Sequence, residues 1–554
     1  TYYIANEYRG YDFNSVTPTS AEFKAAQLPF GGILYTNDNN QYSYNIQNKL
    51  QFSKAFNPDN RLNALLGMEL RSSTAKGTAN KVWGYVPDRG ERIVAPTIPS
   101  EVITPNNPPT GWGILGDIYS RGWQRTDNTN NFLSFFATFA YSFKNRYVVN
   151  ANVRNDASNV FGQDINHRID PTYSFGLSWR ASEEAFFQKH LKWITTLNFR
   201  GTFGIQGNAL TRESPELILS QQGVQPGYNR YFSTIGQIPN PYLSWERTRN
   251  WNFGVDLELF RMFYMNLEYY TRRSNAVITV DLPFEYGIDD MKRNGGIIYN
   301  RGIEYTLSFT PIQKRDFSLN INLNASKNWN KGGETKIDRN TAMYLRGGST
   351  QILKEGYPLS AFWSYSFAGL DGSNGKPMFN YVEVPDEEKS KSIDPTTYLV
   401  YSGETEPYFT GGLGFSFRYK SLSLNTSFSL LLGSKKRLPS PYSDFQGSGS
   451  MMPDPTKNVN RDLLNRWQKP GDEVYTNIPG LPTWPIEIGW TLPNTDSAES
   501  AIEMWEKSDA MVVSGSFLRC RNIGLSWQMK KEWCDKIHAK NLAINFNMYN
   551  IFVI

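Results

Sequence analysis

The chain has 554 residues, with 57 Lys and Arg against 52 Asp and Glu, and 15% of its residues are aromatic. This length allows several soluble domains or one very large barrel. The net charge of +5 is small, and the absence of a basic stripe interleaved with aromatic residues excludes a typical nucleic-acid-binding protein. No run of 18 apolar residues offers a transmembrane helix. The only cysteines, Cys520 and Cys534, exclude a disulfide scaffold and are predicted to be free thiols.

The first clear pattern lies in residues 42–71, on both sides of the turn NPDN at 57–60. Apolar residues such as Ile46 and Leu50 occupy alternate positions, and polar residues such as Gln47 stand between them. A period of two predicts strands with one apolar and one polar face. These strands exceed the usual five or six residues of a globular sheet. A transmembrane strand has this alternation, which averages out in a hydropathy profile.

Period-two runs recur along almost the whole chain, and they predict an all-β protein with about 17 strands. The only predicted helix is a short one in ASEEAFFQKH at 181–190. In chain order the predicted strands are 1–10, 41–56, 61–72, 131–143, 147–156, 171–180, 191–205, 246–259, 263–273, 301–310, 316–330, 349–354, 359–370, 408–419, 421–433, 516–528 and 541–552.

The connections between these strands alternate between short and long. The short ones are 57–60, 144–146, 181–190, 260–262, 311–315, 355–358, 420–421 and 529–540. The long ones are 11–40, 73–130, 157–170, 206–245, 274–300, 331–348, 371–407 and 434–515. Outer-membrane barrels place short turns at the periplasmic end and long loops outside. We therefore predict a transmembrane antiparallel β-barrel whose apolar face contacts lipid and whose polar face lines a wet interior. The alternative is a large soluble sandwich.

Several segments resemble, in order, those of the SusC/RagA-type TonB-dependent transporters of Bacteroidota. They are NVRNDASNVFG (152–162), PTYSFGLSWRASEEAFF (171–187), LKWITTLNFRGTFGIQGN (191–208), NPYLSWERTRNWNFGVDLELF (240–260), NGGIIYNRGIEYTL (294–307), EGYPLSAFWSY (355–365), PYFTGGLGFSFRYKSLSL (407–424), RWQKPGD (466–472) and SFLRCRNIGLSW (516–527). Gly162 and Gly207 occur where strands enter loops, and Asp156 and Ser158 can cap a turn through their side chains. These residues predict a role in folding the rim.

The resemblance implies a barrel of 22 strands, a plug inside it, a Ton box that contacts TonB, and a surface lipoprotein of SusD type. The plug and the Ton box are absent from this sequence. We expect residues 1–554 to form about strands 5–21 of the barrel, with the N-terminal plug and the first strands outside this chain. Because 17 strands do not close an even-numbered barrel, we expect either a fragment of a longer protein or completion by a second polypeptide.

The residues suggest no catalytic centre, no cofactor and no metal site. His167, His190 and His538 lie in three separate connectors, and no His/Cys ligand spacing occurs. LDGSNGK at 370–376 lacks the downstream acid of a calcium loop, which favours an ordinary turn. Aromatic faces suit stacking on sugars, or these rings pack between loops or against a lid. The candidate solute or partner residues are Trp112, Trp123, Tyr228, Tyr231, Phe232 and Tyr286.

The connection 434–515 is rich in proline and is predicted to be an ordered, irregular cap and a candidate partner-docking surface. The first functional hypothesis is import of a glycan or peptide across the outer membrane, with a SusD-like lipoprotein and energy from TonB. The alternative is a SusC-like structural subunit of a larger outer-membrane assembly or secretion complex without transport activity. A passive porin fits less well because the loops are so large. An enzyme is not expected.

Overall fold

The computed structural model describes most of the chain. The described residues are 32–86, 90, 92–93, 123–159, 171–208, 216–225, 230–282, 284–288, 290–333, 345–347, 353–380, 395–442, 458–481, 488–491 and 498–554.

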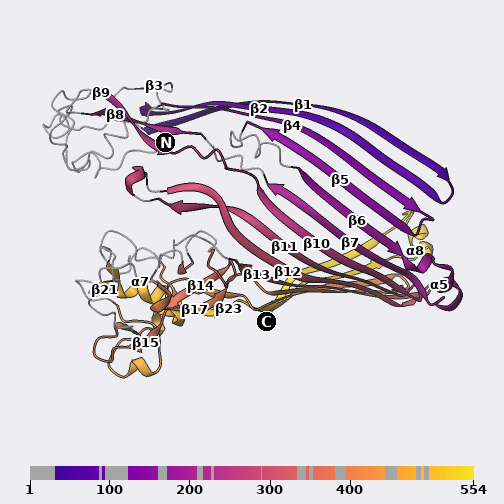
Figure 1. Cartoon of the computed structure of the whole chain (residues 1–554). Helices are drawn as coiled ribbons and strands as arrows, with labels where there is room; N and C mark the ends of the chain where they lie inside the picture. The colour runs from indigo at the N-terminus through magenta and orange to yellow at the C-terminus, as the bar shows by residue number, and fades with distance from the viewer. Residues whose placement is uncertain are drawn as a thin grey trace.

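One antiparallel sheet dominates the molecule and curves into a trough (Figure 1). We call its fourteen consecutively paired strands the wall. In pairing order they are β1 (Gly32–Asn57), β2 (Asn60–Val86), β4 (Trp123–Phe143), β5 (Tyr147–Ser158), β6 (Thr172–Arg180), β7 (Ile194–Asn208), β10 (Glu246–Leu259), β11 (Phe263–Asp281), β12 (Asp290–Gln313), β13 (Phe317–Gly332), β18 (Phe409–Tyr419), β19 (Leu422–Leu432), β24 (Phe517–Gln528) and β25 (Ala543–Val553). A short strand, β3 (Arg92–Ile93), pairs with β2.

Fourteen of the 17 predicted strands correspond to the wall, and the run 1–10 lies outside the described residues. The other two were wrong. Of the run 349–354, only residues 353–354 are described, and they form no strand. The run 359–370 contains β14 (Ala361–Tyr365) and β15 (Phe367–Leu370), which belong to separate small sheets. All five residues of β14 are buried, so this segment has no face for lipid, and β13 pairs directly with β18 instead.

Seven short connections lie at one end of the wall, at the right of Figure 1. Three of them are tight turns in which Lys144, Arg261 and Lys420 have positive φ. The predicted helix near 181–190 is confirmed as η3 (Ala181–Glu183) and α5 (Ala185–His190). The connection between β24 and β25 contains α8 (Lys531–Lys536). The predicted alternation of short and long connections therefore holds around the described wall. The segment 355–358 is the exception, because it lies inside a long connection.

The opposite end carries the long connections and their small elements. The predicted connection 274–300 is mostly strand, since β11 and β12 extend through it. The small strands and helices are β8 (Ile218–Gln225), β9 (Arg230–Gln237), η4 (Phe284–Tyr286), β16 (Pro377–Phe379), η5 (Pro395–Thr397), β17 (Leu399–Glu404), β20 (Lys435–Arg437), η7 (Arg461–Asn465), η8 (Asp472–Val474), β21 (Ile488–Thr491), β22 (Ala498–Ser500), α7 (Ala501–Glu506), η9 (Asp509–Met511) and β23 (Val512–Ser514). Among the described residues, no helix is long and apolar enough to cross a bilayer.

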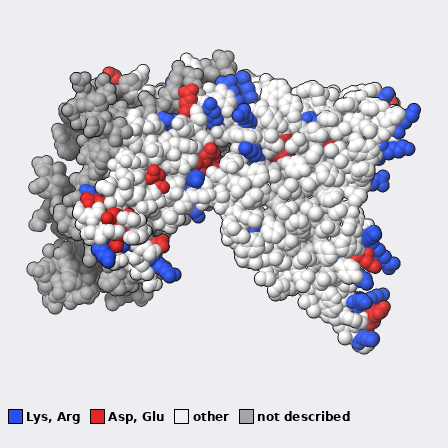
Figure 2. All heavy atoms as spheres, turned by 90° about the horizontal axis from the view of Figure 1, so that it is seen from below, with Lys and Arg blue, Asp and Glu red and all other residues white. Residues whose placement is uncertain are grey.

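The strand register puts apolar side chains together on the outer face of the wall. Leu323 in β13 pairs with Leu307 on one side and with Leu413 on the other. Asn322, the preceding residue, pairs with Ser308 and Gly414 on the inner face. Figure 2 shows a broad band without charged side chains between the charged loop end and the charged short-turn end. This band is the surface expected to contact hydrocarbon.

Candidate functional site

The inner face of the wall is polar and carries fixed charges. Arg154 in β5 binds both carboxylate oxygens of Asp156 through Nε, at 2.8 and 2.9 Å. Its Nη2 donates to Glu69 of β2 at 3.0 Å and to the buried Ser134 of β4 at 2.9 Å. Asn45 of β1 donates to the other oxygen of Glu69 at 3.0 Å. Four strands are thus joined by one hydrogen-bonded cluster.

Asp156 was predicted to cap a turn, and this prediction was wrong. Its carboxylate is occupied by Arg154, because alternation along β5 puts both side chains on the same face, two residues apart. Gly162, the neighbouring glycine of the same motif, lies outside the described residues.

A second cluster surrounds Arg200 of β7. Its Nη2 donates to Asp256 of β10 at 3.3 Å and to Glu268 of β11 at 2.9 Å. The guanidinium lies over Gly254, where a Cβ atom would stand 3.0 Å from Nη2. Asn266 donates to Asp256 at 2.7 Å. Each cluster contains two carboxylates and one guanidinium, so the inner face presents net negative charge at two fixed positions.

A hollow of about 740 Å³ lies along β12, β13, β18 and β19. Asn322, Asn324 and Thr410 contribute amide and hydroxyl groups to its lining. Gly412 and Gly414 leave room for it because they carry no side chain. Such a surface can hydrogen-bond to hydroxyl or peptide groups of a solute.

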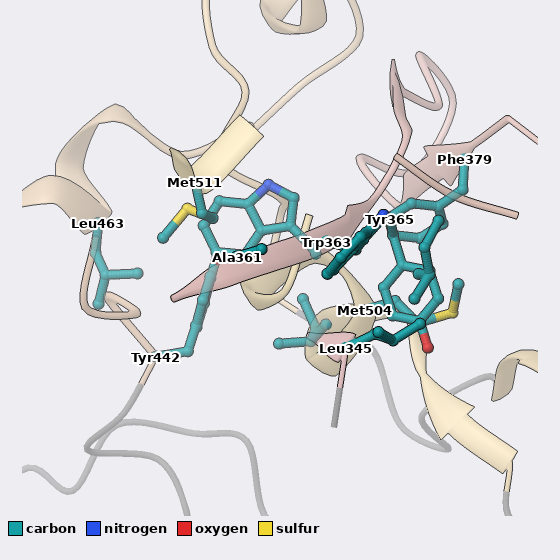
Figure 3. Close-up of a cluster of buried hydrophobic side chains, with 12 residues drawn as sticks. Leu345, Ala361, Trp363, Tyr365, Phe379, Tyr442, Leu463, Met504 and Met511 are labelled. Carbon is teal, nitrogen blue, oxygen red and sulfur yellow. The ribbon is translucent and has the colours of Figure 1, made fainter. Parts of the chain in front are cut away.

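At the loop end the long connections form a compact module with its own hydrophobic core, which we call the cap (Figure 3). Its core residues are Leu345, Ala361, Trp363, Tyr365, Phe379, Leu399, Tyr442, Leu463, Ile502, Met504, Trp505 and Met511. Trp363 of β14 contacts the rings of Tyr357 and Tyr401, with centroids 4.9 and 5.5 Å away. The described parts of 434–515 thus belong to an ordered structure made of short elements, as the prolines predicted.

Two arginines are enclosed in the cap. The guanidinium of Arg437 donates to the carbonyl oxygens of Arg346 and Trp363, the latter at 2.6 Å, and to the Ser364 hydroxyl at 3.1 Å. Arg346 donates to Tyr365 Oη at 2.7 Å. Burial, with a smaller effect of the neighbouring Arg346, lowers the pKa of Arg437 to about 10. Arg437 therefore ties β20 to β14 and to the segment 345–347.

Two sequence motifs that lie almost a hundred residues apart pack together in the cap. Trp467, from RWQKPGD, lies against Gly375, where a Cβ atom would stand 2.3 Å from the indole. Asp371 accepts hydrogen bonds from the Ser373 backbone at 2.8 Å and from its hydroxyl at 2.7 Å. The hydrogen bond from the Ser373 side chain is the main reason that the pKa of Asp371 is lowered. The prediction of an ordinary turn at 370–376 is confirmed, and its role is to receive Trp467.

A third junction forms where motif residues meet at the rim. Trp245 lies over Gly207, where a Cβ atom would stand 2.8 Å from the indole. Asn208 donates to the Glu246 carboxylate at 3.1 Å, and the backbone of Val277 donates to the same carboxylate at 2.9 Å. The rim-folding role predicted for Gly207 is consistent with this packing.

The candidate loop residues do not form one cluster. Trp112 and Tyr228 lie outside the described residues, and Tyr231 lies in β9 with its side chain undescribed. Trp123 begins β4, Phe232 lies in β9 and Tyr286 ends η4. These last three are all exposed, as a role in binding requires, but their role stays a prediction. The clusters around Arg154 and Arg200 were missed by the sequence analysis, although their polar parity was visible.

The described residues contain no group of three His, Cys, Asp or Glu side chains that could hold a metal ion. His167 lies outside the described residues, whereas His190 and His538 both lie in connections at the short-turn end. The prediction of two free thiols is confirmed, and both cysteines are buried.

The family model described as TonB dependent receptor-like, beta-barrel matches residues 1–433. The chain belongs to this family. The resemblance to SusC/RagA-type transporters is thereby confirmed, and the protein is an outer-membrane β-barrel protein.

Similar proteins come from Bacteroidota. TonB-dependent receptor P3 of Formosa agariphila is 23% identical over 452 residues, which are 76% of this chain and 41% of that protein. TonB-dependent receptor SusC of Bacteroides thetaiotaomicron is 25% identical over 428 residues, which are 73% of this chain and 38% of that protein. The chain thus spans less than half the length of these relatives.

Among solved structures, the RagAB peptide importer in its open-open state superposes with a TM-score of 0.70 and 20% sequence identity. The superposition covers 95% of this chain and 53% of that one. At this identity the likeness establishes the fold.

Proposed function

We propose that this chain is the barrel portion of an outer-membrane transporter that imports oligosaccharides or oligopeptides. In this proposal a SusD-like surface lipoprotein delivers the solute, and TonB supplies energy through a plug and a Ton box outside this chain. A solute channel needs a wall with lipid on one side and polar groups on the other. The two-sided wall, with Leu323 outward and Asn322 inward, is the observation that carries the proposal.

The inner surface suits a polar solute of moderate size. Its hollow of about 740 Å³ is large enough for a few sugar units or amino-acid residues, since pockets for small molecules occupy about 300–1,000 Å³. Amide and hydroxyl groups line it, and the fixed carboxylates near Arg154 and Arg200 disfavour strongly anionic solutes. The names of the relatives support both solute classes, because RagAB is a peptide importer and the other relative is SusC.

Deleting the encoding gene tests the proposal. We expect the mutant to lose uptake of one class of labelled oligosaccharide or oligopeptide, and the full-length gene to restore it. Uptake in the complemented strain is expected to stop when the proton gradient is dissipated. Affinity purification is expected to recover one surface lipoprotein. Unchanged uptake of both solute classes, with recovery of several unrelated subunits, would instead support the role in a larger assembly and contradict import.

A further inference from the structure

The short-turn end of the wall is unusually basic for a chain with little net charge. Its seven connections and their flanking residues are 54–61, 144–146, 180–193, 260–262, 313–316, 418–421 and 529–542. Together they contain sixteen Lys and Arg against six Asp and Glu, a net charge of +10, whereas the whole chain has +5. The rest of the chain therefore has a net charge of −5. Figure 2 shows these cations along the right-hand edge, next to the uncharged band.

Five of these cations lie beside exposed aromatic rings at the edge of the uncharged band. The ammonium groups of Lys54, Lys144, Lys420 and Lys530 lie over aromatic rings, at 5.3, 5.3, 5.4 and 6.0 Å from the ring centroids. Arg261 follows Phe260, which stacks on Trp193 with centroids 5.6 Å apart. A lysine stem on an aromatic ring, with its charge toward the rim, is the arrangement that long cationic side chains adopt at a membrane interface.

These five cations have no carboxylate partner. Among the described side chains, all five are exposed and none takes part in an ion pair. Arg146 differs, because Glu184 binds it at 2.9 Å. Exposed ammonium groups with no acidic neighbour can accept an external anion without breaking an internal contact.

The backbone at three of these positions indicates that the charge serves more than the turn. Lys144, Arg261 and Lys420 have φ of 50°, 58° and 51°. Glycine and asparagine adopt this left-handed conformation at lower cost than other residues. Side chains of Lys or Arg at all three positions therefore carry a cost in folding, and interaction of the charge with a partner at the membrane surface offsets it.

We propose that these five cations form a belt that binds the anionic headgroups of phospholipids in the leaflet at the short-turn end. Positive charge close to a bilayer surface attracts anionic lipid, with a contribution of about 1 kcal/mol for each Lys or Arg. The location of the belt decides the partner, because it borders the hydrocarbon band at the level of the headgroups and lies beside the aromatic rings that mark this level. The belt is independent of what the barrel transports.

The test measures lipid selectivity at the protein surface. The full-length protein is reconstituted in phosphatidylcholine bilayers with a trace of spin-labelled phosphatidylglycerol or phosphatidylcholine, and the ratio of their association constants is determined. We expect a ratio of at least about threefold in favour of phosphatidylglycerol, which falls to about one in 1 M NaCl because the Debye length is then only about 3 Å. The variant Lys54→Gln, Lys144→Gln, Arg261→Gln, Lys420→Gln and Lys530→Gln is expected to show a ratio of about one at low salt.

The matched control removes five exposed cations from the loop end, namely Arg230→Gln, Lys435→Gln, Lys436→Gln, Arg461→Gln and Lys469→Gln. It is expected to keep the ratio of the unaltered protein. A ratio near one for the unaltered protein at low salt would overturn the proposal, even if the five-site variant failed to fold. Equal loss in the belt and control variants, or an unchanged ratio in a folded belt variant, would also overturn it.

Discussion

Arg437 illustrates how single residues hold the cap together. Its guanidinium binds oxygen atoms of three residues, and two of them, Trp363 and Ser364, are in β14. A buried cation with these partners costs little only while all its hydrogen bonds are kept. The cap has a core of its own, so its stability can be changed at this residue without touching the wall.

The change Arg437→Met is expected to destabilise the cap by about 3 kcal/mol, because several buried acceptors lose a charged donor. Hydrogen exchange of the amides in β14 measures this effect, while the amides of β13 serve as an internal reference. Lys435→Met, in the same strand but exposed, is expected to change protection by less than about 0.5 kcal/mol. Unaltered protection of β14 in Arg437→Met would contradict the role of this side chain.

Glu184 has a comparable role at the short-turn end. Tyr147 Oη, Arg146 Nη1 and Trp179 Nε1 donate to its carboxylate at 2.6, 2.9 and 3.3 Å. The hydrogen bond from Tyr147 is the main cause that lowers the pKa of Glu184 below its ordinary value. A carboxyl with a lowered pKa stabilises the fold above its ordinary pKa, and this contribution disappears as the pH falls through the lowered value.

We therefore expect the connection 181–193 to loosen as the pH falls from about 6 to 3. Fluorescence of the adjacent Trp179 and protection of nearby amides report this change. Glu184→Gln removes the titrating group, so its signal is expected to be flat across the same window. Glu183→Gln, at the exposed neighbour, serves as the control and is expected to keep the pH dependence.

At the scale of elements, each wall strand has one face for lipid and one for the interior. In β13, Leu323→Arg would put a charge on the hydrocarbon side near the middle of the strand. We expect a loss of about 2–4 kcal/mol of unfolding free energy in lipid, since Arg on the lipid face near the midplane costs this much. Asn322→Arg, one residue earlier, is expected to cost less than about 1 kcal/mol. Equal costs in urea unfolding would show that the faces are assigned wrongly.

The sequence was sufficient to predict the wall strands, because a lipid face and a wet face impose the same period of two on every one of them. It failed for β14, whose residues are buried on all sides and so have no period. The clusters on the inner face were also missed. Glu69 and Arg154 are 85 residues apart, and only the pairing of β2 with β4 and of β4 with β5 brings them together.

At the scale of the whole molecule, three layers follow one another along the wall. The basic short-turn end borders the uncharged band, and the loop end carries the cap (Figures 1 and 2). β1 and β2, with 26 and 27 residues, are more than twice as long as the about 9–11 residues that cross a bilayer. The wall therefore extends well beyond the hydrocarbon on the side of the cap.

The most direct test of this account is a nitroxide scan of residues 317–327 in β13 of the protein reconstituted in bilayers. One spin label at a time reports collisions with apolar oxygen and with a water-soluble nickel chelate. The account predicts that odd positions, such as Leu323, collide more with oxygen, and that even positions, such as Asn322, collide more with the chelate. The same accessibility at odd and even positions, or the opposite phase, would contradict the claim that the apolar face of the wall contacts lipid.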